Sequence, residues 1–122
     1  MADDDVLLMS IVEHARDVRD AMGRLSRAAF DSDVVVRMGI AHLLQVIGEA
    51  ARLLPDPARQ RFPSVPWNLI VGMRHKIVHE YFRIDFDVVW DTANISVPEL
   101  LKALEPEVGP LIDKPQPPNK AP

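Results

Sequence analysis

The sequence predicts an all-α fold, an antiparallel four-helix up-and-down bundle. Three observations support this prediction. Apolar residues recur at spacings of three and four over long stretches, and short segments rich in proline and aspartate separate these stretches. No segment of useful length shows the alternation of a half-buried strand. With 122 residues and an apolar fraction of 48%, the chain can bury the core of one domain.

Each of the first two predicted helices carries one apolar stripe. The first should follow the acidic residues 3–5, which suit a helix N-terminus, and run to about Phe30. Its stripe comprises Ile11, Ala15, Val18, Met22, Leu25 and Ala29. The turn FDSD offers a cap for the second helix, which should run to about Leu54 and be stopped by the prolines that follow. The second stripe comprises Val36, Ile40, Leu43, Ile47, Ala50 and Leu54.

Two further helices are predicted after a proline-rich connector that should hold one short helical turn. The third helix should begin near Pro66, with Ser64 as its cap, and continue through WNLIVGMRHKIVHEYF. The turn RIDFD leads to a fourth helix at about 87–105, which Pro98 should kink. Its apolar stripe comprises Val89, Ala93, Val97, Leu100 and Leu104.

The end of the chain differs in composition from the rest. Residues 106–122 hold six of the eleven prolines, and proline removes the backbone donors that helices and strands need. We therefore predict a helical domain at 1–105 and an extended or disordered proline-rich tail at 106–122. The alternative is a packed C-terminal arm that docks through Val108, Leu111 and Ile112.

Composition narrows the classes of function. The chain has no cysteine, so disulfides and thiolate metal sites are excluded. The N-terminus MADDDVLL is acidic where a signal peptide would be basic, and no run is expected to approach the length needed to cross a membrane, so a cytoplasmic protein is expected. A net charge of -4 disfavours a broad basic surface that coats nucleic acid but leaves a local basic cleft possible.

The stretch GMRHKIVHEYF at 72–82 sets cationic residues into an apolar helical pattern. On a continuous helix, Arg74 would lie near the middle of the apolar half, where an unpaired charge is costly unless it has a partner or a wet cleft. A structural salt bridge to Glu49, a semi-buried His79 and an edge Tyr81 are the plain alternatives. His75 and His79, four apart, could also share a zinc ion, but the segment lacks the glutamate of an HExxH motif.

Clustered arginine and histidine suit the cleavage of RNA by its own 2′-hydroxyl. A histidine that titrates near neutrality can take the proton of the 2′-hydroxyl or protonate the leaving 5′-oxygen. An arginine can bind the negative charge that builds up on the phosphorus centre. This reaction needs no metal ion. Since one histidine can serve one proton transfer at a time, a second copy across a symmetric dimer is an attractive arrangement.

The segment RHKIVHEY resembles the Arg-polar-x3-His-x-Tyr signature of the HEPN superfamily, specifically the HepT-like toxins of toxin–antitoxin pairs. The surrounding segments IGEAARLLPD at 47–56 and FPSVPWNLIVGMRHKIVHEYFRIDFDVVW at 62–90 follow the family's order, and the resemblance covers roughly residues 5–105. It implies a HEPN-like bundle and a homodimer with a shared cleft. It also implies a catalytic pair, Arg74 and His79, supported by His75 at a position where asparagine or aspartate is more usual.

The resemblance further implies a protein partner. Tyr81 matches the tyrosine that a minimal nucleotidyltransferase antitoxin modifies with AMP from ATP, and a bulky anion there would repel an RNA phosphate. ATP and magnesium would belong to that partner, so this chain is expected to need no cofactor. The expected function is a metal-independent endoribonuclease toxin that acts on RNA. The alternative is a non-catalytic helical module that binds a nucleotidyltransferase or a nucleotide.

Overall fold

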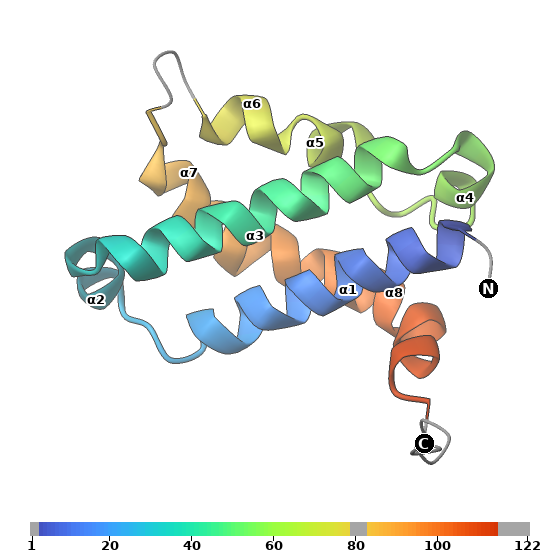
Figure 1. Cartoon of the computed structure of the whole chain (residues 1–122), viewed down its shortest axis with the longest axis horizontal. Coiled ribbons are helices and arrows are strands. Elements are labelled where there is room, and N and C mark those ends of the chain that lie inside the picture. Colours follow the sequence, from blue (N-terminus) through green and yellow to red (C-terminus); the bar gives the residue numbers. More distant parts are fainter. Residues whose placement is uncertain (1–2, 79–82, 115–122) are drawn as a thin grey trace, which may run out of the picture.

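The computed structural model describes residues 3–78 and 83–114, and it is a bundle of helices (Figure 1). The elements in chain order are α1 (Asp3–Met22), α2 (Arg27–Ser32), α3 (Val34–Leu53), α4 (Asp56–Gln60), α5 (Trp67–Val71), α6 (Met73–Ile77), α7 (Phe86–Asp91), the π-helical segment η2 (Thr92–Ser96) and α8 (Val97–Ile112). Among the described residues, the β structure is limited to one antiparallel bridge between Val78 and Ile84. The all-α bundle prediction is confirmed.

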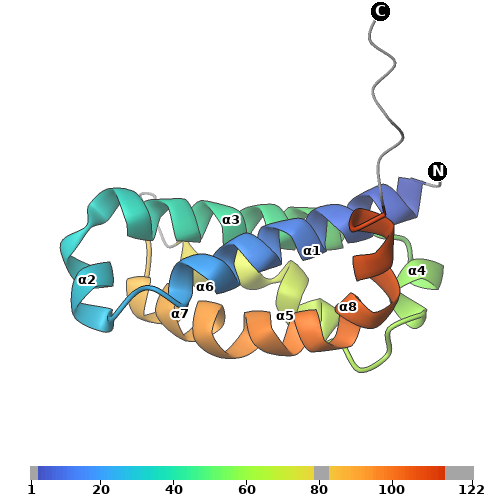
Figure 2. The ribbon, with the colours of Figure 1, turned by 90° about the horizontal axis from the view of Figure 1, so that it is seen from below.

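Four rods make up the bundle. Helix α1 packs between α3 and α8, and the short helices α5 and α6 pack on α3 at one edge of the bundle (Figures 1 and 2). The segment α7–η2–α8 forms the last rod, and α4 is the short helical turn predicted in the connector. The interior is apolar, and no polar or charged residue among those described is buried in it. Its largest fully buried side chains include Phe30, Leu8, Ile11, Ile40, Leu44, Ile47, Ile77 and Leu104.

The first predicted helix is two helices. The prediction that it runs to Phe30 is wrong, because α1 ends at Met22 and a turn leads into α2. Ser26 caps α2 by accepting a hydrogen bond from the backbone amide of Ala29 at 3.1 Å. Phe30 on α2 is fully buried and lies edge-on against the ring of Trp90 at 5.2 Å between centroids, so α2 closes the end of the bundle.

The last helix extends beyond the predicted domain boundary. Residues 106–112 belong to α8, so the extended tail does not begin at 106. The packed-arm alternative holds for Val108, which is fully buried, and for the partly buried Ile112, whereas Leu111 is 41% exposed. Burial of Leu104 and Val108 offsets the cost of the two prolines within the helix. Residues 115–122 lie outside the described part, so the prediction for them stays a prediction.

Arg16 on α1 fastens these last turns to the bundle. Its guanidinium donates to both carboxylate oxygens of Glu105 at 2.8 Å and to both of Asp113 at 2.9 Å. These bonds raise the pKa of Arg16 and lower the pKa values of Glu105 and Asp113. A Cβ atom at Gly109 would lie 2.7 Å from the Glu105 Oε2 atom, so a larger residue there would require the Glu105 carboxylate to shift. We call the ion pairs of Arg16 with Glu105 and Asp113 the Arg16 clamp.

Pro98 disturbs the fourth rod in a specific way. Because Pro98 has no N–H for the carbonyl of Asn94, the helical ladder is interrupted there. The preceding segment η2 adopts π-helical bonding, with the amide of Val97 donating to the carbonyl of Thr92. The predicted irregularity therefore takes the form of a π-helical segment just before the proline.

Helix α3 is unusually apolar. It is the one helix of the described residues long and apolar enough to cross a membrane by length and composition, with a mean hydropathy of 1.4. The expectation that no run reaches that length is therefore wrong. Since α3 contributes its fully buried Leu44 and Ile47 to the core, the helix is also accounted for as a core helix of the bundle.

Candidate functional site

The segment with the predicted site residues is a broken helix. The third helix is not continuous as predicted, because α5 ends at Val71, α6 begins at Met73, and Val78 adopts an extended conformation. Glycine is a poor helix former, and Gly72 stands at the break. Ser64 is not the cap that was predicted, since Pro66 occupies the N-cap position of α5 without a side-chain hydrogen bond.

Trp67 anchors this segment to the connector. Its indole Nε1 donates to the carbonyl of Arg59 at 3.0 Å and to the carbonyl of Phe62 at 3.1 Å. The Trp67 side chain is 8% exposed, and Ile70 one turn later is also buried. These contacts fix the position of α5 in the bundle, and α6 follows directly from it along α3.

A glycine on α3 allows α5 and α6 to approach closely. A Cβ atom at Gly48 would lie 3.1 Å from the carbonyl oxygen of Ile70 and 3.8 Å from the Cβ atom of Met73. Both neighbours are buried, so a larger side chain at position 48 would push the broken helix away from α3. Gly48 therefore sets the distance between α3 and the helix that carries Arg74.

Arg74 is exposed on α6 and does not point into the core. The core positions of α6 are Met73, 4% exposed, and Ile77, fully buried. The buried positions Ile70, Met73 and Ile77 centre the apolar face to one side of Arg74, so the predicted position of Arg74 near the middle of the apolar half is wrong. Within residues 3–78 and 83–114, no carboxylate lies within 4 Å of the Arg74 guanidinium.

The neighbouring charges belong to α3. Arg52 donates to both carboxylate oxygens of Glu49, from Nη2 at 2.7 Å and from Nε at 3.0 Å. The hydrogen bond from Arg52 lowers the pKa of Glu49, and the positive charge of Arg74 lowers it further. Glu49 is thus committed to Arg52, and the salt bridge between Arg74 and Glu49 that the sequence left possible is not formed. The guanidinium groups of Arg52 and Arg74 and the carboxylate of Glu49 thus lie where α3 meets α6, a region that we call the Arg74 seam. These three groups carry a net positive charge in an acidic protein.

The structure places only part of the predicted site. Arg74 and His75 are both exposed on α6, whereas His79 and Tyr81 lie outside the described residues. Whether His79 lies beside Arg74 therefore stays a prediction. In the part of the chain with described positions, no group of three or more histidine, aspartate or glutamate side chains could hold a metal ion.

The outward face of α3 was not anticipated from the sequence. Along this face, which continues from Glu49 away from the seam, apolar side chains lie uncovered: Val35 is 77% exposed and Met38 is 45% exposed. Between them and Glu49 lie Gly39, whose Cβ position is open with nothing within 4 Å, and the exposed His42. The signal was available in the spacing 35, 39, 42, 46, 49 and 53, which is helical but mixes residue types.

Comparisons with known proteins identify the family. A family model described as Ribonuclease HepT-like matches residues 11–106. The chain belongs to this family. Among the relatives of this HepT-like chain from Methanocaldococcus jannaschii, "Putative RNase MJ1380" is 34% identical over 80% of this chain and 90% of its own length. "Putative RNase MJ1216" is 32% identical over 80% of this chain and 81% of its own length. "Probable ribonuclease HepT" of Thermococcus cleftensis is 32% identical over 58% of this chain and 64% of its own length. No solved structure matches the HepT-like chain.

Proposed function

We propose that this HepT-like protein is a metal-independent endoribonuclease, the toxin of a toxin–antitoxin pair. Family membership supports ribonuclease activity at the level of the family. The observation that carries the proposal for this chain is the exposed Arg74, which forms no ion pair with a carboxylate among the described residues and whose charge acts on the Glu49–Arg52 pair. An arginine without an acidic partner at the surface is available to bind a phosphate.

In the proposed reaction, the 2′-oxygen of RNA attacks the adjacent phosphorus and the bond from phosphorus to the 5′-oxygen breaks. The proton of the 2′-hydroxyl passes to neutral His79, and the leaving 5′-oxygen receives a proton from a second donor, either water or an imidazolium. Arg74 binds the non-bridging oxygens, where negative charge increases in the transition state. The products are a 2′,3′-cyclic phosphate and a 5′-hydroxyl end. His75 supports Arg74 from the neighbouring position.

The active form is proposed to be a homodimer. The uncovered apolar face of α3, with Val35 and Met38 and the open position at Gly39, offers a surface on which a second α3 could approach closely. This face continues into Glu49 and the Arg74 seam, so a partner there would place two seams side by side. A shared cleft would supply the second proton donor that one histidine cannot provide.

Control of the toxin is proposed to act through Tyr81. A minimal nucleotidyltransferase antitoxin would transfer AMP from ATP to the Tyr81 hydroxyl in the cytoplasm, with magnesium and ATP bound by that partner. Tyr81 lies two residues after His79 in the sequence. Each added AMP would bring a negative phosphate to the cleft and oppose RNA binding by repulsion and by bulk.

The direct test is cleavage of RNA by purified, unmodified protein in EDTA. We expect products with 2′,3′-cyclic phosphate ends, and we expect both Arg74→Ala and His79→Ala to lower the rate at least 100-fold. Arg24→Ala removes an exposed arginine from the turn between α1 and α2 and is the matched control, which should cleave like the wild type. Loss of cleavage by chelation alone, or full activity of His79→Ala, contradicts the mechanism.

The same variants test the alternative of a non-catalytic module. That alternative predicts no cleavage by the wild type and a stable complex with the nucleotidyltransferase that Arg74→Ala weakens. Co-expression with the neighbouring gene followed by intact mass measurement tests the modification. An added mass in multiples of AMP on the peptide that contains Tyr81 is expected, and an unmodified peptide contradicts this part of the proposal.

A further inference from the structure

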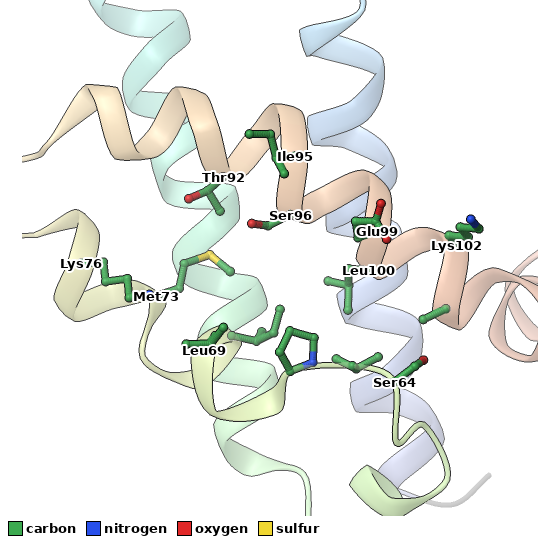
Figure 3. Close-up of a pocket in the computed structure, with 14 residues that line it drawn as sticks. Ser64, Leu69, Met73, Lys76, Thr92, Ile95, Ser96, Glu99, Leu100 and Lys102 are labelled. Carbon is green, nitrogen blue, oxygen red and sulfur yellow. The ribbon is translucent and has the colours of Figure 1, made fainter.

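A groove of about 630 Å³ lies on the opposite side of α6 from the Arg74 seam. One wall is formed by α5 and α6 and the other by η2 and α8 (Figure 3). Each wall helix packs on a different long helix, α5 and α6 on α3 and α8 on α1, so a valley is left between them. Because residues 74 and 76 are about 200° apart on a helix, Lys76 faces this groove while Arg74 faces away.

The groove is apolar inside and remains apolar at its rims. Met73, Ile70 and Leu100 contribute to its lining. Leu69 on one wall is 58% exposed and Ile95 on the other is 64% exposed, and both are left in contact with water. A small molecule lying inside the groove would leave these rim side chains in water. A helix lying along the groove would cover them, which favours the larger occupant.

Charge indicates the chemistry of that occupant. The chain has four lysines, two of which, Lys114 and Lys120, lie near its C-terminus. The other two, Lys76 and Lys102, both line this groove. Neither has an ion pair within 4 Å among the described residues. Figure 3 shows Lys76 at one end and Lys102 at the other, where Glu99 lies beside it. The Lys76 end is therefore the more favourable for a carboxylate.

The spacing of the wall residues also suits a helix. Leu69, Met73 and Lys76 follow one another at intervals of four and three on one wall, and Thr92, Ser96, Glu99 and Ala103 do so on the other. Side chains at these intervals form parallel ridges, and the groove between two such ridges accepts the apolar face of a third helix. We propose that the groove binds an amphipathic α-helix of a partner protein, with apolar anchors on one face and a carboxylate that reaches Lys76.

The test is a selection followed by a charge swap. A display library of helical peptides is selected on the wild-type protein, with counter-selection on the Ile95→Asp variant. We expect enriched peptides with apolar residues at i, i+3 or i+4, and i+7, and with an acidic residue near one end. No enrichment over the counter-selection, or enrichment of basic peptides, overturns the proposal.

One synthetic enriched peptide is then measured by fluorescence anisotropy. Leu69→Asp should weaken its binding at least tenfold, and Lys76→Glu several-fold; replacing the acidic residue of the peptide by lysine should restore binding to Lys76→Glu. Lys102→Glu should weaken peptide binding less than Lys76→Glu, because Glu99 already lies beside Lys102. Leu111→Asp and Lys114→Glu change exposed residues of the same types outside the groove and should bind normally.

The outcomes separate this site from the ribonuclease. All groove variants should retain their circular dichroism melting profile, because the substituted side chains are exposed. Equal binding by wild type and groove variants, or binding that ignores the charge swap, overturns the proposal whether or not the protein cleaves RNA. Binding of decanoate with the same dependence on Lys76, in the absence of any enriched peptide, overturns it in favour of a small amphipathic ligand.

Discussion

Removal of the Arg16 clamp should destabilise the bundle measurably. Arg16→Met keeps an apolar stem of similar reach and removes the guanidinium, so it deletes the charge-assisted hydrogen bonds without opening a large cavity. The Arg16 and Glu105 side chains are 20% and 28% exposed, and the two bonds between them measure 2.8 Å. Hydrogen bonds to charged groups contribute about 1.5–3 kcal/mol, and partial exposure favours the lower end. Asp113, at 63% exposed, adds less.

We therefore expect Arg16→Met to lower the free energy of unfolding by about 2 kcal/mol. Urea unfolding followed by circular dichroism at constant pH measures it, and Arg24→Met, an exposed arginine without a carboxylate partner in the described residues, is the control. A double-mutant cycle with Glu105→Gln should give a coupling free energy above about 1 kcal/mol. A coupling below about 0.5 kcal/mol, or equal effects in Arg16→Met and Arg24→Met, would refute the reasoning.

The same clamp should make stability depend on pH in a defined direction. The pKa values of Glu105 and Asp113 are lowered in the folded state, because Arg16 hydrogen bonds favour their charged forms. A lowered folded-state pKa gives stability that is present above the unfolded pKa, at about pH 5 and higher, and is lost as the pH falls through the folded-state value. The difference between wild type and Arg16→Met should therefore shrink below about pH 4.

Three further predictions concern the site and its support. Arg74→Leu should change the free energy of unfolding by less than about 0.5 kcal/mol, since the exposed side chain has no carboxylate partner among the described residues; a large loss in urea unfolding would indicate a structural role. Gly48→Val should destabilise the fold by about 1–3 kcal/mol and slow RNA cleavage, because the carbonyl of Ile70 is only 3.1 Å from the Cβ position; unchanged melting and activity would contradict the proposed spacing. Asp33→Ala should lower the free energy of unfolding by about 1 kcal/mol, because the Asp33 carboxylate accepts hydrogen bonds from two backbone amides at the start of α3. Thermal melting measures this loss. Asp56→Ala, in a helix without a side-chain cap hydrogen bond, should lower it less.

Local patterns predicted the main helices but not where they break. The apolar stripe of α1 was recognised correctly, and its members Ile11, Ala15 and Val18 are fully buried. The same spacing continued through Leu25 across the turn into α2, which concealed the end of α1. Proline content suggested a tail from 106, because the Arg16 clamp that holds those turns joins residues about 90 positions apart and leaves no local signal.

The residue types of the candidate site could be predicted, but their arrangement could not. The sequence singled out Arg74 as an unusual charge, and the structure exposes it. Its proximity to Glu49 depends on how closely α3 and α6 approach, and the contact between Gly48 and the carbonyl of Ile70 sets that distance. Contacts between helices distant in the sequence cannot be obtained from the spacing of residues within one helix.

The shortness of α6 has a genetic consequence. A helix of five residues is not stable in isolation, so α6 depends on the packing of Met73 and Ile77 in the core. This packing fixes the orientation of Arg74. If the chain is toxic when expressed alone, spontaneous suppressor mutations should be scattered across α3 and the connector as well as the motif. Such suppressor mutations would then identify more of the residues that support Arg74 than of the residues that take part in catalysis.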